Sequence, residues 1–161
     1  MGAKSLAVAQ HILTRQKDKA DTVTPMQLVK LTYIAHGMTL GLLGRALLDE
    51  QVEAWKYGPV VRSVYDAVSK YGSSPIETVV PHELYSAYDG FLNLQEKNII
   101  DYVSDTYGNI PAFTLSDATH AEGTPWHVTM QRVGGYYPCI PDDEIEIFYK
   151  NNVINKKHNR L

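Results

Sequence analysis

Histidine and carboxylate side chains come closest together between residues 120 and 127, where His120, Glu122 and His127 could converge on a metal ion. Zinc requires three or four ligands, usually on a regularly spaced motif such as His-Glu-x-x-His, and here a proline turn separates the side chains. We therefore expect no metal site and no cofactor. Instead, we interpret His120 as a hydrogen-bond donor that fixes the loop before Trp126.

The residues that could act as a catalytic nucleophile are also poorly placed. Cys139 is the only cysteine and lies between Pro138 and Ile140, and apolar surroundings of this kind disfavour the reactive thiolate. The sequence contains no Gly-x-Ser-x-Gly elbow. The run Gly41-Leu42-Leu43-Gly44 lacks the spacing and the Lys-Ser/Thr pair of a phosphate-binding loop. These patterns predict that the protein is not an enzyme and has no nucleotide site.

The composition fits an ordinary globular domain. Of the 161 residues, 44% are hydrophobic and 20% are charged, which suits a folded core rather than disorder. The formal net charge of -3 differs from the basic surplus of DNA-binding domains, so nucleic acid is not an expected partner. The single cysteine, and the lack of a signal-peptide pattern or an apolar run of about 18 residues, favour a cytoplasmic protein without membrane association.

Apolar residues at helical spacing run through most of the chain and predict six or seven helices. They occupy approximately residues 3–15, 25–42, 60–71, 92–107, 114–120, 126–132 and 142–153. The clearest helix start is at Pro25, where Thr24 can act as the N-cap and Gln27 completes a capping box.

Between these helices the pattern changes at two places. The run Val52-Glu53-Ala54-Trp55 indicates a short strand, after which Pro59 suits the first turn of a new helix. Residues 73–88 are expected to form a long connection that contains a strand-like run, Thr78-Val79-Val80. The predicted fold is mainly α, a compact single-domain bundle of six or seven helices with a minor short β-strand or hairpin component. We expect one domain over residues 1–154 and a polar C-terminal tail over 155–161.

The helix that begins at Pro25 could also be half of a helix-turn-helix motif. Its polar positions are Gln27, Lys30, Thr32 and His36, which is a thin supply for both phosphate contacts and base reading. A solvated helix face explains these residues equally well. A prophage-encoded DNA-binding regulator is therefore kept as the alternative function.

Four blocks of the sequence resemble those of the Panacea domain, also called the SocA-like or phage-associated antitoxin domain. They are Pro25–Gly37 with its Lys-Leu-x-Tyr pattern, Glu53–Val60, the run Leu115–His120 leading into Pro125-Trp126, and the stretch Ile140–Tyr149. The second block, Glu-Ala-Trp-Lys-Tyr-Gly-Pro-Val, is the most specific of the four.

The resemblance implies an antitoxin of a toxin–antitoxin system that neutralises a cognate protein toxin by direct binding. In one branch of the family the antitoxin is a proteolytic adaptor that delivers its toxin to the ClpXP protease. The implied partners are thus a toxin and the ClpXP protease, and homo-oligomerisation is left open.

The motif residues are expected to be mainly structural. They are Lys30, Leu31, Tyr33, Trp55, Tyr57, Gly58, Pro59, Tyr65, His120 and Trp126. On an extended segment Trp55 and Tyr57 would face one side. They would either set the angle at which the Pro59 helix leaves the core or form an interface anchor. We favour the structural role, with Tyr57 partly exposed.

Some exposed positions are candidates for contact with a partner. They are Lys56, Tyr57, Arg62, Tyr85 and Tyr88. The chain has 11 tyrosines against 3 phenylalanines, and tyrosine serves both the edges of cores and protein interfaces. The loop over residues 73–88 and the C-terminal helix are better candidates for partner specificity, because loops vary more freely than cores.

Overall fold

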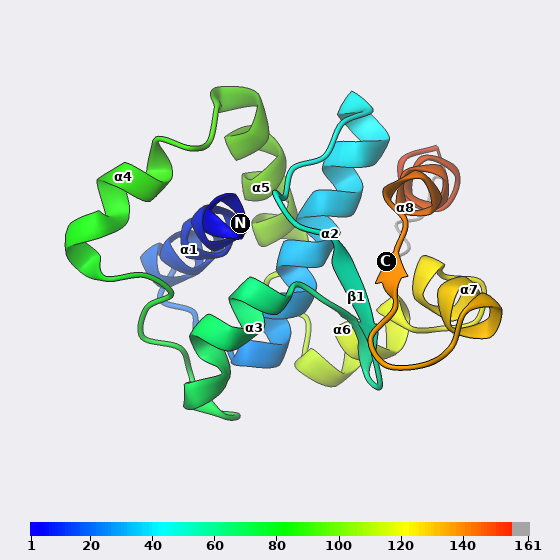
Figure 1. Ribbon diagram of the computed structural model, residues 1–161. Helices are drawn as coiled ribbons and strands as arrows, with labels where there is room; N and C mark the ends of the chain where they lie inside the picture. The colour runs from blue at the N-terminus through cyan, green and yellow to red at the C-terminus, as the bar shows by residue number, and fades with distance from the viewer. Residues whose placement is uncertain (156–161) are drawn as a thin grey trace.

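The helix that begins at Pro25 is the centre of the molecule (Figure 1). This helix, α2 (Pro25–Leu43), has Thr24 as its N-cap, whose backbone is extended and whose N–H donates to Gln27 Oε1 at 3.0 Å. It ends at Gly44, which takes a left-handed conformation with φ of 70°. The predicted capping box is confirmed.

In this computed structural model, residues 1–155 are described, and they form eight α-helices and a sheet of three strands. The remaining helices are α1 (Ala3–Asp18), α3 (Arg62–Val68), α4 (Tyr85–Asp89), α5 (Leu94–Tyr107), α6 (Ala112–Thr119), α7 (Pro125–Arg132) and α8 (Asp142–Tyr149). Short 3₁₀ turns cover Ser69–Tyr71 and His82–Leu84, and a π-helical turn, Lys150–Ile154, extends α8. The mainly helical fold with a minor strand component is confirmed. The expected polar tail lies, beyond Asn155, outside the described residues.

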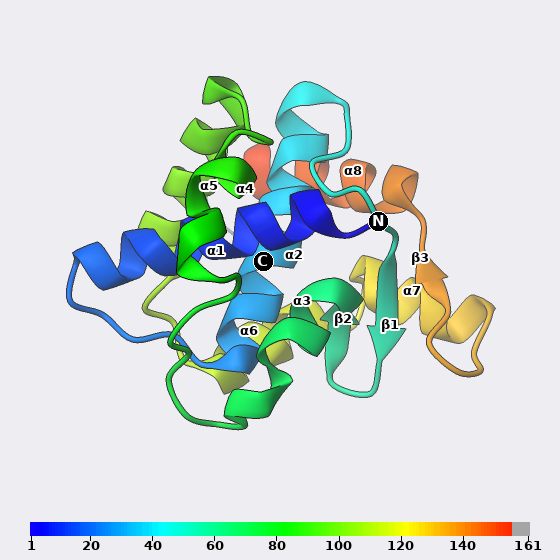
Figure 2. The same cartoon turned by 60° about the vertical axis from the view of Figure 1, so that its left-hand side comes forward.

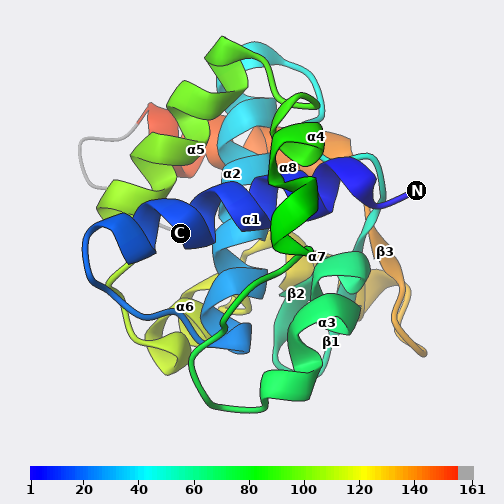
Figure 3. The same cartoon turned by 90° about the vertical axis from the view of Figure 1, so that its left-hand side faces the viewer.

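The other helices surround α2. Helices α1 and α5 pack on one side of it and α8 on the other, while α3 and α6 pack near its N-terminal half (Figures 1 and 3). The largest fully buried side chains come from α1, α2, α5, α6 and α8 together, so one core is shared by all of them. No helix among the described residues has both the length and the apolarity to cross a membrane.

Because α2 is enclosed, its polar residues do not form a solvated face, and that part of the sequence interpretation is wrong. Lys30, Thr32 and His36 are all buried. Each finds a partner inside the protein. Lys30 Nζ donates to the carbonyl of Pro59 at 2.9 Å, Thr32 Oγ1 donates to the carbonyl of Leu28 at 2.8 Å, and His36 Nε2 lies 2.9 Å from Asp142 Oδ1. A helix with these side chains turned inward has little left to offer to DNA.

The sheet joins two distant parts of the chain. Strand β1 (Val52–Trp55) is central and pairs antiparallel with β2 (Gly58–Val60) and with β3 (Cys139–Ile140) (Figure 2). Pro59 therefore lies in a strand and not in the first turn of a helix, which begins only at Arg62. Strand β2 is at the edge of the sheet, where a proline without an N–H is tolerated.

The connection after α3 contains no strand among its described residues. Thr78, Val79 and Val80 are held by a side chain instead: the Oε1 atom of buried Gln10 accepts hydrogen bonds from the N–H groups of Val79 at 2.9 Å and Val80 at 3.2 Å. The short helix α4 follows and lies against α1 (Figure 3). The backbone N–H groups of this strand-like run are thus bonded to a glutamine of α1, and no local sequence pattern predicts that contact.

Candidate functional site

The hairpin formed by β1 and β2 is held at its tip by side chains from three helices. Its carbonyl oxygens accept from Trp126 Nε1 on α7 (to Trp55, 2.7 Å), Ser116 Oγ on α6 (to Tyr57, 2.7 Å) and Lys30 Nζ on α2 (to Pro59, 2.9 Å). A two-stranded hairpin is marginally stable alone, so these bonds fix where the tip lies. Three of the sequence blocks meet at this point.

Gly58 at the hairpin turn is required by its backbone and by its neighbours. Its φ of 118° is rarely adopted by residues with a side chain. A Cβ placed there would lie 3.1 Å from Lys30 Nζ and 3.4 Å from Thr119 Oγ1. The glycine therefore lets the hairpin approach α2 and α6 closely enough for the lysine to reach Pro59.

A pocket of about 430 Å³ opens beside this hairpin, and we call it the hairpin pocket. One wall is the first turns of α2, with Pro25, Met26 and Val29, and the other walls come from the hairpin, from α3 and the turn after it, and from the loop before β3. Most of the lining is apolar or aromatic, and the volume falls in the range of ordinary ligand sites.

The aromatic wall of the hairpin pocket is organised around Trp55. The ring of Tyr137 stacks on Trp55 with centroids 4.3 Å apart, and Tyr65 packs at 4.9 Å. The guanidinium of Arg62 covers both Trp55 and Tyr137, at 5.1 Å and 5.5 Å from the ring centroids. Glu53 links the group, since its carboxylate accepts from Trp55 Nε1 at 2.9 Å and from Arg62.

Lys30 is the buried polar group of this pocket. Lys30 is only 3% exposed, and burial lowers the pKa of its ammonium group to about 7. Among the described residues its side chain has the Pro59 carbonyl as a hydrogen-bond acceptor and no ion pair with a carboxylate. Near neutral pH the amine is therefore divided between its charged and neutral forms. An anionic ligand would favour the charged form, because the ligand supplies the counter-charge that the protein does not.

The remaining motif residues divide between this corner and the core. His120 Nδ1 donates to the carbonyl of Ser116, 2.5 Å away on its own helix, and its ring meets Trp126 edge-on at 5.2 Å. It thus supports the tryptophan by packing rather than by a bond to the loop. Leu31 and Tyr33 are buried in the core and lie away from the hairpin pocket lining.

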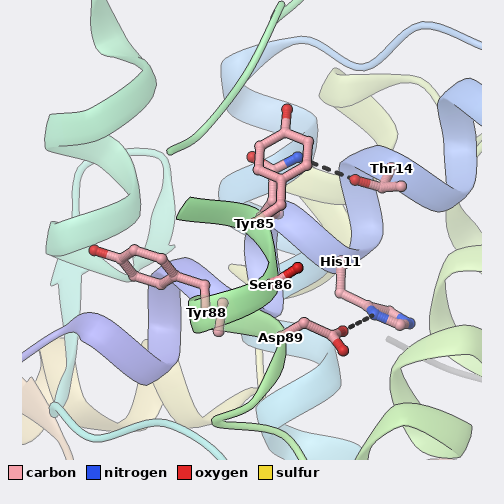
Figure 4. Close-up of a pocket in the computed structure, with 8 residues that line it drawn as sticks. His11, Thr14, Tyr85, Ser86, Tyr88 and Asp89 are labelled. Carbon is pink, nitrogen blue, oxygen red and sulfur yellow. Dashed lines mark hydrogen bonds and ion pairs between the residues drawn. The ribbon is translucent and has the colours of Figure 1, made fainter. Parts of the chain in front are cut away.

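The candidates for partner contact occupy two separate places. Lys56 and Tyr57 line the hairpin pocket and Arg62 covers its aromatic wall. Tyr85 and Tyr88 instead line a smaller pocket of about 260 Å³ between α1 and α4 (Figure 4). Figure 4 shows His11 of α1 and Asp89 of α4 directed toward each other across it.

The second pocket differs chemically from the first. His11 lies between two carboxylates, with Nε2 at 2.7 Å from Asp101 and Nδ1 at 3.8 Å from Asp89. Tyr85 is tied to Thr78, with 2.7 Å between the two hydroxyl oxygens. Several polar groups of this second pocket are therefore already paired, whereas the lining of the hairpin pocket is mostly aromatic and apolar and includes a buried lysine. The hairpin pocket is the stronger candidate for binding.

Sequence reasoning missed Tyr137, which lines the hairpin pocket, and Ser116, which holds the hairpin. Tyr137 follows the Gly134-Gly135 pair and adopts a positive φ of 48°, so no strand or helix period marks it. Ser116 was not singled out, because one serine in a helix carries no signal for a contact 59 residues earlier in the chain. The adjacent tyrosines 136 and 137, which follow the two glycines and are both exposed, were the available signal.

The histidine and carboxylate groups around residues 120–127 make no cluster of ligands. Across residues 1–155, no group of three or more histidine, cysteine, aspartate or glutamate side chains is arranged to hold a metal ion. Cys139 is exposed in β3 rather than enclosed by apolar residues.

Comparison with known proteins adds a family relationship to this geometry. The sequence model described as antitoxin SocA-like, Panacea domain, matches residues 28–127. The antitoxin SocA of Caulobacter vibrioides (strain NA1000 / CB15N) is 32% identical over 127 residues, which are 76% of this chain and 68% of that protein. No solved structure matches the chain. The matched range includes Lys30, the hairpin and Trp126, and stops short of Tyr137.

Proposed function

The chain belongs to the SocA-like antitoxin family with the Panacea domain, and from this we propose that it is an antitoxin that neutralises a cognate protein toxin by direct binding. Family membership is the observation that carries the proposal. The hairpin pocket supports it, because exposed aromatic side chains around a preformed depression are typical of protein interfaces.

Binding is the first step of two routes to neutralisation. In the first route the antitoxin masks the toxin and both proteins persist. In the second it is an adaptor that passes the toxin to the ClpXP protease. Both routes require the same contact, so the contact is the part to test first.

Co-expression with the products of the adjacent genes tests the proposal. We expect one neighbour to be toxic alone, to be tolerated together with this protein, and to co-purify with it. If no neighbour is both toxic and rescued, the proposal is wrong.

Repeating the rescue in a host that lacks ClpX separates the two routes. Rescue that persists, with a stable complex, indicates masking. Loss of rescue together with accumulation of the toxin indicates proteolytic delivery.

A DNA-binding regulator has no structural observation in its favour within residues 1–155. Three of the four polar residues of α2 that a helix-turn-helix would use, Lys30, Thr32 and His36, are buried, and the formal net charge is -3.

A further inference from the structure

The hairpin pocket has a charge pattern that differs from the rest of the chain. Overall the protein has 18 acidic residues against 15 lysines and arginines. The charged residues that line the pocket are nevertheless both lysines, Lys30 and Lys56, and no aspartate or glutamate of the described chain lines it. The Glu53 carboxylate beside it is engaged by Arg62 and Trp55. The pocket lining therefore carries basic side chains and no acidic one, in a protein whose net charge is negative.

Lys30 at this site has unused capacity for a ligand. A charged lysine can donate three hydrogen bonds, and the Pro59 carbonyl takes one of them. Burial of an ammonium without a counter-charge is unfavourable, and the lowered pKa of Lys30, about 7, reflects this cost. A carboxylate brought into the pocket would supply the missing partner.

The walls favour an apolar group next to that carboxylate. Trp55, Tyr65 and Tyr137 present aromatic surface, and Met26 offers a side chain that adapts to different shapes. Tyr57 at the rim is 56% exposed and Tyr137 is 44% exposed, so both have surface left to bury. The wall residues are held by stacking and by the bonds to the hairpin carbonyls, which lowers the cost of ordering them on binding.

We propose that the hairpin pocket binds an acidic segment of the toxin, in which an aspartate or glutamate pairs with Lys30 and an adjacent aromatic or aliphatic side chain packs against Trp55 and Tyr57. This inference rests on the proposed function, because it assumes a protein partner. It assigns to the motif Glu53–Val60 a binding role in addition to its role in the fold.

The test uses the toxic neighbour identified by co-expression and measures its affinity for purified variants by calorimetry. Lys30→Met removes the ammonium at nearly constant length, and Tyr57→Ala removes an exposed aromatic wall. We expect each to weaken binding by about 30-fold, the size of an interface hot spot, and to weaken rescue of growth. Lys97→Met is the matched control: it removes one lysine from α5, away from the pocket, and should bind as wild type does.

The outcomes separate the two proposals. If the wild-type protein binds no toxic neighbour, the proposed function fails. If wild type binds and the folded Lys30→Met and Tyr57→Ala variants bind equally well, the function stands and the pocket assignment is wrong. If Lys97→Met weakens binding as much as Lys30→Met, the effect is one of net charge and the pocket assignment is again wrong. Circular dichroism and urea unfolding confirm that each variant is folded before its affinity is interpreted.

Discussion

Lys30 is an ionisable side chain that the fold encloses with no counter-ion among residues 1–155, and this affects the stability of the protein. In the unfolded chain its pKa is the ordinary 10.5, and in the folded protein burial lowers the pKa to about 7. At pH values between these two pKa values, the unfolded state binds more protons than the folded state does. The free energy of unfolding therefore rises with pH across this window, and this stability is lost as the pH falls toward 7.

We expect Lys30→Met to remove that dependence. From pH 7 to pH 9 the free energy of unfolding of the wild type should rise by about 2 kcal/mol relative to the variant, as measured by urea denaturation. The range stops at pH 9 because burial raises the pKa values of Tyr33, Tyr107 and Tyr149, and these groups destabilise the fold as the pH passes the ordinary tyrosine value. Lys97→Met should run parallel to the wild type. Parallel curves for Lys30→Met as well would show that the buried amine keeps its ordinary pKa.

Ser116 is a small residue whose hydroxyl holds the hairpin. It is 3% exposed and donates to the carbonyl of Tyr57 at 2.7 Å. Ser116→Ala should lower the free energy of unfolding by about 1–2 kcal/mol, because the carbonyl loses its donor. Ser86→Ala, an exposed serine of α4, is the control and should change stability by less than about 0.5 kcal/mol. If Ser116→Ala loses as little stability as Ser86→Ala, the carbonyl of Tyr57 has another hydrogen-bond donor.

At the scale of elements, the approach of α8 to α2 depends on two glycines one helical turn apart. A Cβ on Gly37 would collide with the ring of Tyr149, and one on Gly41 would collide with the side chain of Ile154. Tyr149 is fully buried at this contact and meets Tyr33 edge-on, with ring centroids 6.1 Å apart. The glycines inside α2 thus serve packing, although glycine is a poor helix former.

We expect Gly37→Ala to lower the free energy of unfolding by about 1–3 kcal/mol, since overpacking outweighs the gain in helix propensity. The control is Gly90→Ala, whose φ of -65° suits any residue and whose Cβ would meet its nearest neighbour at 3.4 Å. It should be neutral or slightly stabilising. Thermal unfolding of both variants tests this prediction. An unchanged unfolding midpoint for Gly37→Ala would show that α8 moves aside without loss of stability.

Features that depend on residues close together in the sequence could be predicted, and features that depend on distant residues could not. The start of α2 was predictable, because Thr24, Pro25 and Gln27 determine it within a few residues. Pro59 was assigned to a helix because its role depends on pairing with Ala54 across the hairpin. Thr78–Val80 resembles a strand by composition, but its backbone is satisfied by Gln10, 69 residues away from Val79. Such partners are set by the tertiary fold.

At the scale of the whole molecule, the hairpin pocket also depends on contacts between residues far apart in the sequence. Periodicity marks α2 as amphipathic, yet it could not show that Lys30 and His36 would be enclosed by the helices and strands on the polar side as well. The hairpin pocket depends on Tyr137, which enters from a loop more than 70 residues beyond the hairpin. The motif blocks could be found from the sequence, but the surface they form together could not.

The molecule should also differ in stability between its centre and its edge. Residues 72–92, which we call the strap, cross the outer side of α1, and neither α4 nor the 3₁₀ turn before it has a buried residue (Figure 3). The strap is held mainly by buried Ile76, Val80 and Leu92 and by the bonds to Gln10. We therefore expect fast amide hydrogen exchange in the strap and slow exchange in α2, because local opening follows the amount of buried contact.

Gln10→Met should increase exchange in the strap, by about tenfold at the N–H groups of Val79 and Val80, and leave α2 nearly unchanged. The reason is that methionine fills the site but accepts no strong hydrogen bond from the two backbone donors. Thr14→Ala is the matched control, since Thr14 accepts from Gln10 Nε2 and its loss leaves the bonds from Gln10 Oε1 to the strap in place. Mass spectrometry of exchanged peptides distinguishes the results. If Gln10→Met accelerates exchange equally in α2 and in the strap, the strap is part of the global folding unit and does not open on its own.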